Sequence, residues 1–157
     1  MATASIPAMK KLFFSLYFVF GFSFIVFGQS KLDPGKFTKF TGIEKPVNLK
    51  SGEKLLCIFN LECDDCQATA SLLKDMKKTN KSIPSVYVLF YKEGDTTPEK
   101  FGQITGTNFP NALLSVDDFF NVIGDYPPRI YYLKDGVIKG TWDNDFAKHL
   151  KETFPAK

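Results

Sequence analysis

Two cysteines, Cys63 and Cys66, have the type and spacing best suited to chemistry in this chain. They follow a short apolar run at 54–60 and precede a segment, 64–79, whose apolar residues recur at helical spacing. A helix beginning here would place both thiols at its N-terminus, where free N–H groups and the helix dipole stabilise a thiolate. Cysteines at this spacing can also close a disulfide. The segment therefore predicts thiol–disulfide exchange.

Other interpretations of the cysteine pair stay open from the residues alone. The pair could form a purely structural disulfide, as is common in exported domains. Metal binding, including copper handling, would need further cysteine or histidine ligands, and His149 is the single histidine of the chain. We therefore expect no metal site and no cofactor apart from a redox-active disulfide. Cys57, within the apolar run, is expected to be a small buried hydrophobe, although it could also link two chains.

The N-terminal segment, residues 1–28, has the layout of a secretory signal peptide. Lys10 and Lys11 precede an almost wholly apolar run at 12–27, and Gly28 is a small residue at its exit. Because a membrane span needs about 20 residues, retention as an N-terminal membrane anchor is the alternative. We expect one domain at 29–157, exported, that contacts a membrane only through residues 12–28 if they are not cleaved.

Charge and cysteine count narrow the function classes. The chain carries a net charge of +3, which falls to +1 when the two lysines of residues 1–28 are removed. A nearly neutral domain gives no support to nucleic-acid binding. Three cysteines in an exported chain suggest one redox couple and one separate thiol.

Strand and helix patterns alternate along the chain and predict an α/β fold with a central mixed β-sheet flanked by helices. Strands are expected at 54–60, 85–91, 111–115, 129–133 and 137–142, with weak strand character at 35–40. Helices are expected at 64–79, 98–105, 117–123 and 143–154, the last capped by Asp143 or Asn144.

Three local features resemble the thioredoxin-like superfamily, and most closely its exported TlpA/ResA-type thiol–disulfide oxidoreductases. The first is the strand–Cys63-Asp64-Asp65-Cys66–helix order, and the second is the segment 126–136, YPPRIYYLKDG, with Pro128 at the cis-proline position. The third, 109–120, is similar to an extra strand–helix segment of that subgroup. The resemblance covers about residues 35–154 and implies a thioredoxin-like fold with this extra segment.

The resemblance also implies roles for individual residues. Cys63 would attack a client disulfide and Cys66 would resolve the mixed disulfide, with Pro127 and Pro128 in the substrate-binding loop. The sequence departs from the family pattern in having Glu62 where an aromatic residue is usual and Cys57 where thioredoxins carry a buried acid. Pro127 also lacks the N–H that would pair with a docked substrate strand.

The acids around the dithiol, Glu62, Asp64 and Asp65, are interpreted as thiol-tuning residues. Carboxylates beside a thiol disfavour the thiolate and oppose the helix dipole. Because oxidants are proteins whose reduced thiolate is stabilised, this sequence predicts a reductase.

The expected function is that of an exported oxidoreductase with a role in cell redox homeostasis. It would act in the bacterial periplasm or at the outer face of the inner membrane. It would reduce disulfide-bearing exported proteins and take electrons from a membrane or periplasmic donor. The alternative from another class is a non-catalytic thioredoxin-fold binding domain that keeps a structural disulfide.

Overall fold

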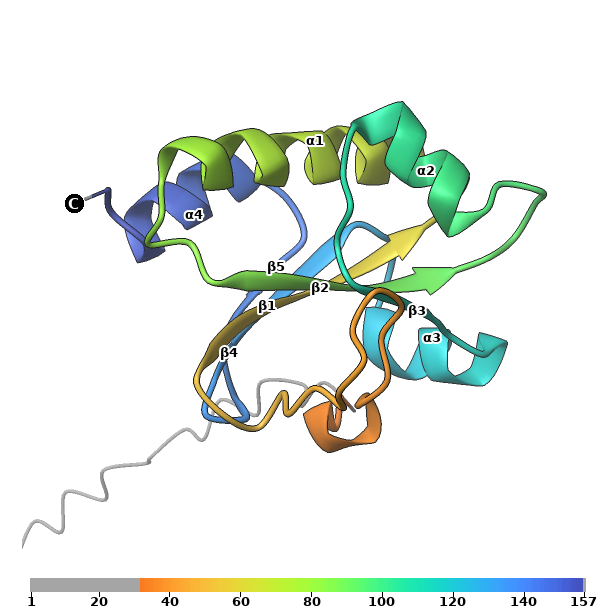
Figure 1. Cartoon of the computed structure of the whole chain (residues 1–157), viewed down its shortest axis with the longest axis horizontal. Coiled ribbons are helices and arrows are strands. Elements are labelled where there is room, and N and C mark those ends of the chain that lie inside the picture. The colour runs from red at the N-terminus through yellow and green to blue at the C-terminus, as the bar shows by residue number, and fades with distance from the viewer. Residues whose placement is uncertain (1–31, 157) are drawn as a thin grey trace, which may run out of the picture.

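A five-stranded mixed sheet runs through residues 32–156, the part of the chain that this computed structural model describes (Figure 1). The strands lie in the order β3-β2-β1-β4-β5. β1 and β3 both pair in parallel with β2, whereas β4 is antiparallel to β1 and to β5. The sequence-based prediction of a mixed sheet is confirmed. The strand bounds are β1 Glu53–Asn60, β2 Ser85–Tyr91, β3 Asn111–Leu113, β4 Arg129–Lys134 and β5 Val137–Trp142.

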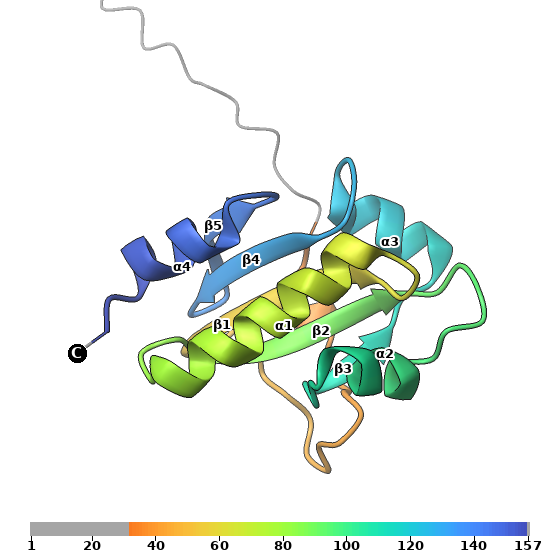
Figure 2. The ribbon, with the colours of Figure 1, turned by 90° about the horizontal axis from the view of Figure 1, so that it is seen from above.

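Helices cover both faces of this sheet (Figures 1 and 2). α1, α2 and α4 lie on one face, and α3 lies on the other together with a short 3-10 helix, η1. Their bounds are η1 Pro34–Lys36, α1 Asp64–Thr79, α2 Pro98–Thr105, α3 Val116–Ile123 and α4 Phe146–Thr153. The β1–α1–β2 order, the extra β3–α3 segment and the final hairpin with its helix all follow the predicted pattern.

The central strand β1 divides the core into two layers. Leu55, Cys57 and Phe59 belong to the buried cluster on the α1 side, whereas Leu56 and Ile58 belong to the cluster on the α3 side. Successive side chains of a strand point to opposite faces, so a strand covered on both faces needs an unbroken apolar run. This double burial holds the end of β1, and the cysteine motif that follows it, in the middle of the sheet.

The expected strand character at 35–40 is wrong, because the chain forms η1 at Pro34–Lys36 and no strand at 37–40. Pro34 fills the first position of η1, and the Asp33 carboxylate accepts the backbone N–H of Gly35 at 2.9 Å. A proline with fixed φ and an Asp-capped turn favour a short helix over an extended strand.

The last helix begins later than its pattern predicts. α4 starts at Phe146, and its N-cap Asp145 makes no side-chain cap bond. Asp143, one of the two expected caps, instead accepts two hydrogen bonds from the Arg129 guanidinium, at 2.5 and 2.9 Å. The Asp143 carboxylate is therefore engaged in a charge-assisted bidentate pair with Arg129 and does not cap α4.

None of the helices within residues 32–156 has the length and apolar character needed to cross a bilayer. The expected signal peptide or anchor at 1–28 lies outside the described residues.

Candidate active site

A tight turn carries the chain from β1 into α1 and sets both cysteines of the motif just beyond the C-terminal end of this central strand. Asn60 shapes this turn, because its side-chain oxygen accepts the backbone N–H of Glu62 at 2.9 Å. The Asn60 backbone carbonyl also accepts the N–H of Cys63 at 3.2 Å. Cys63 is the N-cap residue of α1, and Asp64 is the first residue of the helix.

Cys63 is the accessible thiol of the pair. Its side chain is half-buried, and its Sγ accepts the backbone N–H of Cys66 at 3.2 Å, in the manner of a helix cap. Negative charge on this sulfur is favoured by the N–H donor and by the positive end of the helix dipole. The position therefore suits a nucleophilic thiolate that a client disulfide can reach.

Cys66 lies in the first turn of α1, three residues after Cys63, and is fully buried. Burial raises the pKa of its thiol, and the neighbouring Cys63 thiol and the Asp65 charge raise it further. The backbone N–H of Asn60 donates to Cys66 Sγ at 3.4 Å and acts in the opposite direction on this pKa. No disulfide joins Cys63 and Cys66 in this structure.

The Pro127-Pro128 peptide bond is cis and lies beside the accessible thiol. Cys63 Sγ is 4.0 Å from the carbonyl oxygen of Pro127. Pro128 directly precedes β4, which pairs with β1, and this pairing brings the two loops together. The structure thus unites the two prolines and the cysteine pair, which are separated by about sixty residues in the sequence.

The three acids proposed to tune the thiols occupy different surroundings. Asp64 and Asp65 are exposed in the first turn of α1, and the Asp65 charge contributes to the raised pKa of Cys66. Glu62 reaches the loop after β2, where its carboxylate accepts the backbone N–H of Thr96 at 2.8 Å. This bond is the main reason that the pKa of Glu62 lies below its usual value.

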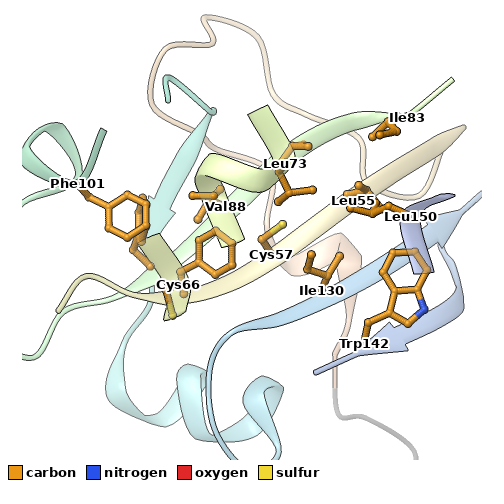
Figure 3. Close-up of a cluster of buried hydrophobic side chains, with 14 of the residues drawn as sticks. Leu55, Cys57, Cys66, Leu73, Ile83, Val88, Phe101, Ile130, Trp142 and Leu150 are labelled. Atoms are coloured by element: carbon orange, nitrogen blue, oxygen red, sulfur yellow. The ribbon is translucent and has the colours of Figure 1, made fainter. Parts of the chain in front are cut away.

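Cys57 lies within the core and not at the surface of the site. It is fully buried in the centre of β1, in register with Val88 of β2 and Ile130 of β4. Burial raises the pKa of the Cys57 thiol. Figure 3 shows Cys57 and Cys66 in one hydrophobic cluster, to which Leu73 of α1 also belongs. Cys57 therefore packs as a small hydrophobic side chain where a buried acid was expected by resemblance.

His149, the single histidine of the chain, takes part in an aromatic stack. Trp142 stacks between Tyr132 and His149, with ring centroids 6.4 and 5.4 Å away. Among the residues that the structure describes, no group of three or more His, Cys, Asp or Glu side chains could hold a metal ion.

Two polar residues beside the dithiol were not singled out from the sequence. Asn60 ends β1, and its side-chain N–H group donates to the Glu93 carboxylate at 2.8 Å. Glu93 lies in the loop between β2 and α2, and nothing in its spacing from Asn60 indicates that the two side chains meet. An asparagine two residues before Glu62 is nevertheless a turn-forming signal, because its side chain readily accepts the N–H two positions further on.

Comparison with known proteins gives one curated relative and several similar structures. No protein-family model matches the chain. Protein TlpB of Flavobacterium psychrophilum is 30% identical over 105 residues, which make up 62% of this chain and 28% of TlpB. The chain thus spans less than a third of the length of that relative.

Two solved structures resemble the chain at low sequence identity. One is a secreted Mycobacterium tuberculosis disulfide oxidoreductase homologous to E. coli DsbE, with 15% identity and a TM-score of 0.52 over 64% of this chain and 77% of that one. The other is a thiol:disulfide interchange protein from Bacteroides sp., with 18% identity and a TM-score of 0.50 over 70% of this chain and 80% of that one. The chain therefore has the thioredoxin-like fold that these disulfide oxidoreductases share.

Proposed function

We propose that this chain is an exported thiol–disulfide oxidoreductase that reduces disulfides in other exported proteins. The observation that carries the proposal is the asymmetry of the dithiol. Cys63 is accessible at the N-terminus of α1 and lies 4.0 Å from the Pro127 carbonyl, whereas Cys66 is fully buried behind it. One thiol is placed to attack, and the other is shielded until the first has reacted.

The proposed reaction transfers two electrons from the protein to its client. The Cys63 thiolate attacks one sulfur of a client disulfide, forms a mixed disulfide and releases the other client sulfur as a thiolate that takes up a proton. Cys66 then loses its proton and attacks Cys63 Sγ, which forms the Cys63–Cys66 disulfide and releases the second client thiol. The client disulfide is reduced to two thiols, and the dithiol of the protein is oxidised to one disulfide.

The cis-proline loop would receive the client segment. Pro127 has no N–H, so its backbone can only accept a hydrogen bond from a docked strand. Its carbonyl is the group beside Cys63 Sγ, which suits an acceptor that aligns an extended client chain across the thiol. Pro128 follows Pro127 through the cis peptide bond and directly precedes β4.

The acids of the motif support the reducing direction. Asp64 and Asp65 place two negative charges in the first turn of α1, and the Asp65 charge raises the pKa of Cys66. A reduced form whose thiolates are not strongly stabilised gives up electrons readily, which lowers the reduction potential of the couple.

Export to the bacterial periplasm, or to the outer face of the inner membrane, is part of the proposal. The basic and apolar pattern of residues 1–28 supports it, as does the description of the similar M. tuberculosis protein as secreted. The protein would then take electrons from a membrane or periplasmic dithiol donor. Cell fractionation and the mass of the mature N-terminus test this part, and an intact chain in the cytosol would overturn it.

Insulin reduction by the protein tests the proposed activity. Cys63→Ser is expected to abolish turnover, because the attacking sulfur is lost. Cys57→Ala is the matched control, a buried cysteine outside the exchange, and is expected to retain turnover. Absence of turnover in the unchanged protein, with a cysteine pair that resists reduction until the fold is lost, would instead indicate a binding domain with a structural disulfide.

Equilibration against glutathione tests the reducing direction. We expect a potential near that of thioredoxin, about −270 mV, and a value near that of DsbA, about −120 mV, would contradict it.

A further inference from the structure

Asn60 makes four contacts that together define the geometry of the dithiol turn. Its backbone N–H donates to Cys66 Sγ at 3.4 Å, and its backbone carbonyl accepts the N–H of Cys63 at 3.2 Å. Its side-chain oxygen accepts the N–H of Glu62 at 2.9 Å, and its side-chain N–H group donates to Glu93 at 2.8 Å. One residue therefore contacts both redox cysteines through its backbone and is itself held through its side chain.

The loop after β2 supplies the anchor for this residue. Glu93 binds the Asn60 side chain, and three residues later the backbone N–H of Thr96 donates to the Glu62 carboxylate at 2.8 Å. Thr97 then caps α2, so the loop is fixed at its far end as well. The loop and the dithiol turn are thus joined by two side-chain hydrogen bonds. These bonds add to the pairing of Asn60 with Tyr91 at the end of the β1–β2 ladder in holding the Asn60 backbone.

The burial of Cys66 makes the position of the Asn60 backbone N–H important for the reactivity of this thiol. Its thiol is fully buried and must lose a proton before it can attack, yet burial disfavours the charged sulfur. Cys57, an apolar neighbour in the same cluster, offers no charge to assist. The backbone N–H of Asn60 is the donor directed at Cys66 Sγ, and a hydrogen bond to an ionised acceptor is stronger than one to a neutral group.

We propose that Asn60 is a positioning residue for the resolving step, in which Cys66 attacks Cys63 Sγ of the mixed disulfide. Held by Glu93, it keeps its backbone N–H on Cys66 Sγ and its carbonyl on the Cys63 N–H. The inference rests on the proposed oxidoreductase function. It adds that the second step depends on this asparagine more strongly than the first.

Rapid mixing of the reduced protein with oxidised glutathione, followed by acid quench and intact-mass analysis, separates the two steps. Glutathione on Cys63 reports the first step, and its loss with formation of the Cys63–Cys66 disulfide reports the second. Asn60→Ala is expected to slow the second step about 5-fold, the effect of weakening one hydrogen bond, while the first changes less than about 2-fold.

The chain offers matched controls for this measurement. Asn48 makes the same type of local turn contact, with its side-chain oxygen accepting the N–H of Lys50 at 2.9 Å, but it lies before β1 and away from the thiols. Asn48→Ala is expected to leave both steps unchanged. Glu93→Gln keeps an acceptor for Asn60 and should retain the resolving rate, whereas Glu93→Ala should slow it.

The outcomes distinguish this inference from the function on which it rests. An unchanged protein that never passes from the glutathione adduct to the internal disulfide would overturn the proposed oxidoreductase itself. A normal resolving step in the unchanged protein and an equal rate in Asn60→Ala would overturn only the role of Asn60. Equal slowing of both steps, with a lowered unfolding midpoint, would also contradict it, because a general loss of structure does not select one step.

Discussion

Replacing Cys57 by aspartate tests the assigned environment of this thiol, because it puts a carboxyl group where the resemblance expects a buried acid. The site lies in the middle of β1, fully buried, with apolar neighbours Val88 and Ile130 on the adjacent strands. A carboxylate there would lose its hydration without a cation to compensate. Cys57→Asp should therefore hold a neutral carboxyl group in the folded protein and destabilise the fold when that group is forced to ionise.

The expected size follows from the burial. A fully buried carboxyl group without a charged partner has a pKa raised by about 2 to 3 units, and each unit corresponds to about 1.36 kcal/mol. The folded pKa lies above the unfolded value of about 3.9, so the folded state binds more protons between these two values. Stability relative to the unchanged protein is therefore lost as pH rises from about 4 to about 7, by about 3 kcal/mol.

Urea unfolding of the variant at pH 4 and at pH 7.5 measures this loss, with Cys57→Ala as the control. The alanine variant has no titrating group at this position, so its difference from the unchanged protein should be the same at both pH values. The aspartate variant should lose about 3 kcal/mol more at pH 7.5 than at pH 4. An equal deficit at both pH values would refute the reasoning, because it would mean that water or a charged group reaches this position.

Further substitutions address the motif, the core and the cis-proline loop. Asp64→Asn with Asp65→Asn should raise the reduction potential by about 10 to 20 mV in glutathione equilibration, because removing exposed charges stabilises a neighbouring thiolate slightly; an unchanged or lower potential would contradict this. Phe101 of α2 is buried against Phe59 and Phe90. Phe101→Ala should therefore lower the free energy of unfolding by about 3 to 5 kcal/mol, and a loss below about 1 kcal/mol would count against this packing role. Asp143→Asn should lower the unfolding free energy by about 1 kcal/mol, and less at high salt, because it breaks the bidentate pair with the Arg129 guanidinium; an effect independent of salt would argue for another cause.

The sequence predicted most of the sheet because burial leaves a clear pattern. β1 and β2 are covered on both faces, so their residues read as apolar runs bounded by turns, and the strand expected at 85–91 has the observed bounds. α1 also has the predicted bounds, since its acidic first turn and its lysines in the last turn mark both ends.

The local sequence pattern gave wrong element bounds where contacts between distant residues determine the structure. Nothing near Asp143 shows that its carboxylate belongs to Arg129, on the neighbouring strand, and so the start of α4 was misplaced. Ser115 was assigned to a strand but is the N-cap of α3, where its hydroxyl accepts the N–H of Asp118 at 3.1 Å. Serine fits both settings, and the tertiary environment selects one.

In the candidate site too, local features were predictable from the sequence and long-range contacts were not. The helix N-terminus and the cysteine spacing identify Cys63 and Cys66 from the sequence, because both features are local. The orientation of Glu62 toward Thr96 and the bond between Asn60 and Glu93 depend on the loop after β2, more than thirty residues away. Contacts of this kind between polar side chains leave no periodic pattern that could predict them.

Trapping the first intermediate tests the central claim most directly. In Cys66→Ser, the resolving thiol is absent, so a client disulfide attacked by Cys63 should remain attached as a mixed disulfide. Incubation of this variant with a disulfide-bonded peptide, followed by proteolysis and mass mapping, locates the adduct. The account predicts one peptide on Cys63 and an unmodified Cys57. A variant that accumulates no adduct under conditions in which free glutathione reacts with the same peptide, or that carries the adduct on Cys57, would contradict it.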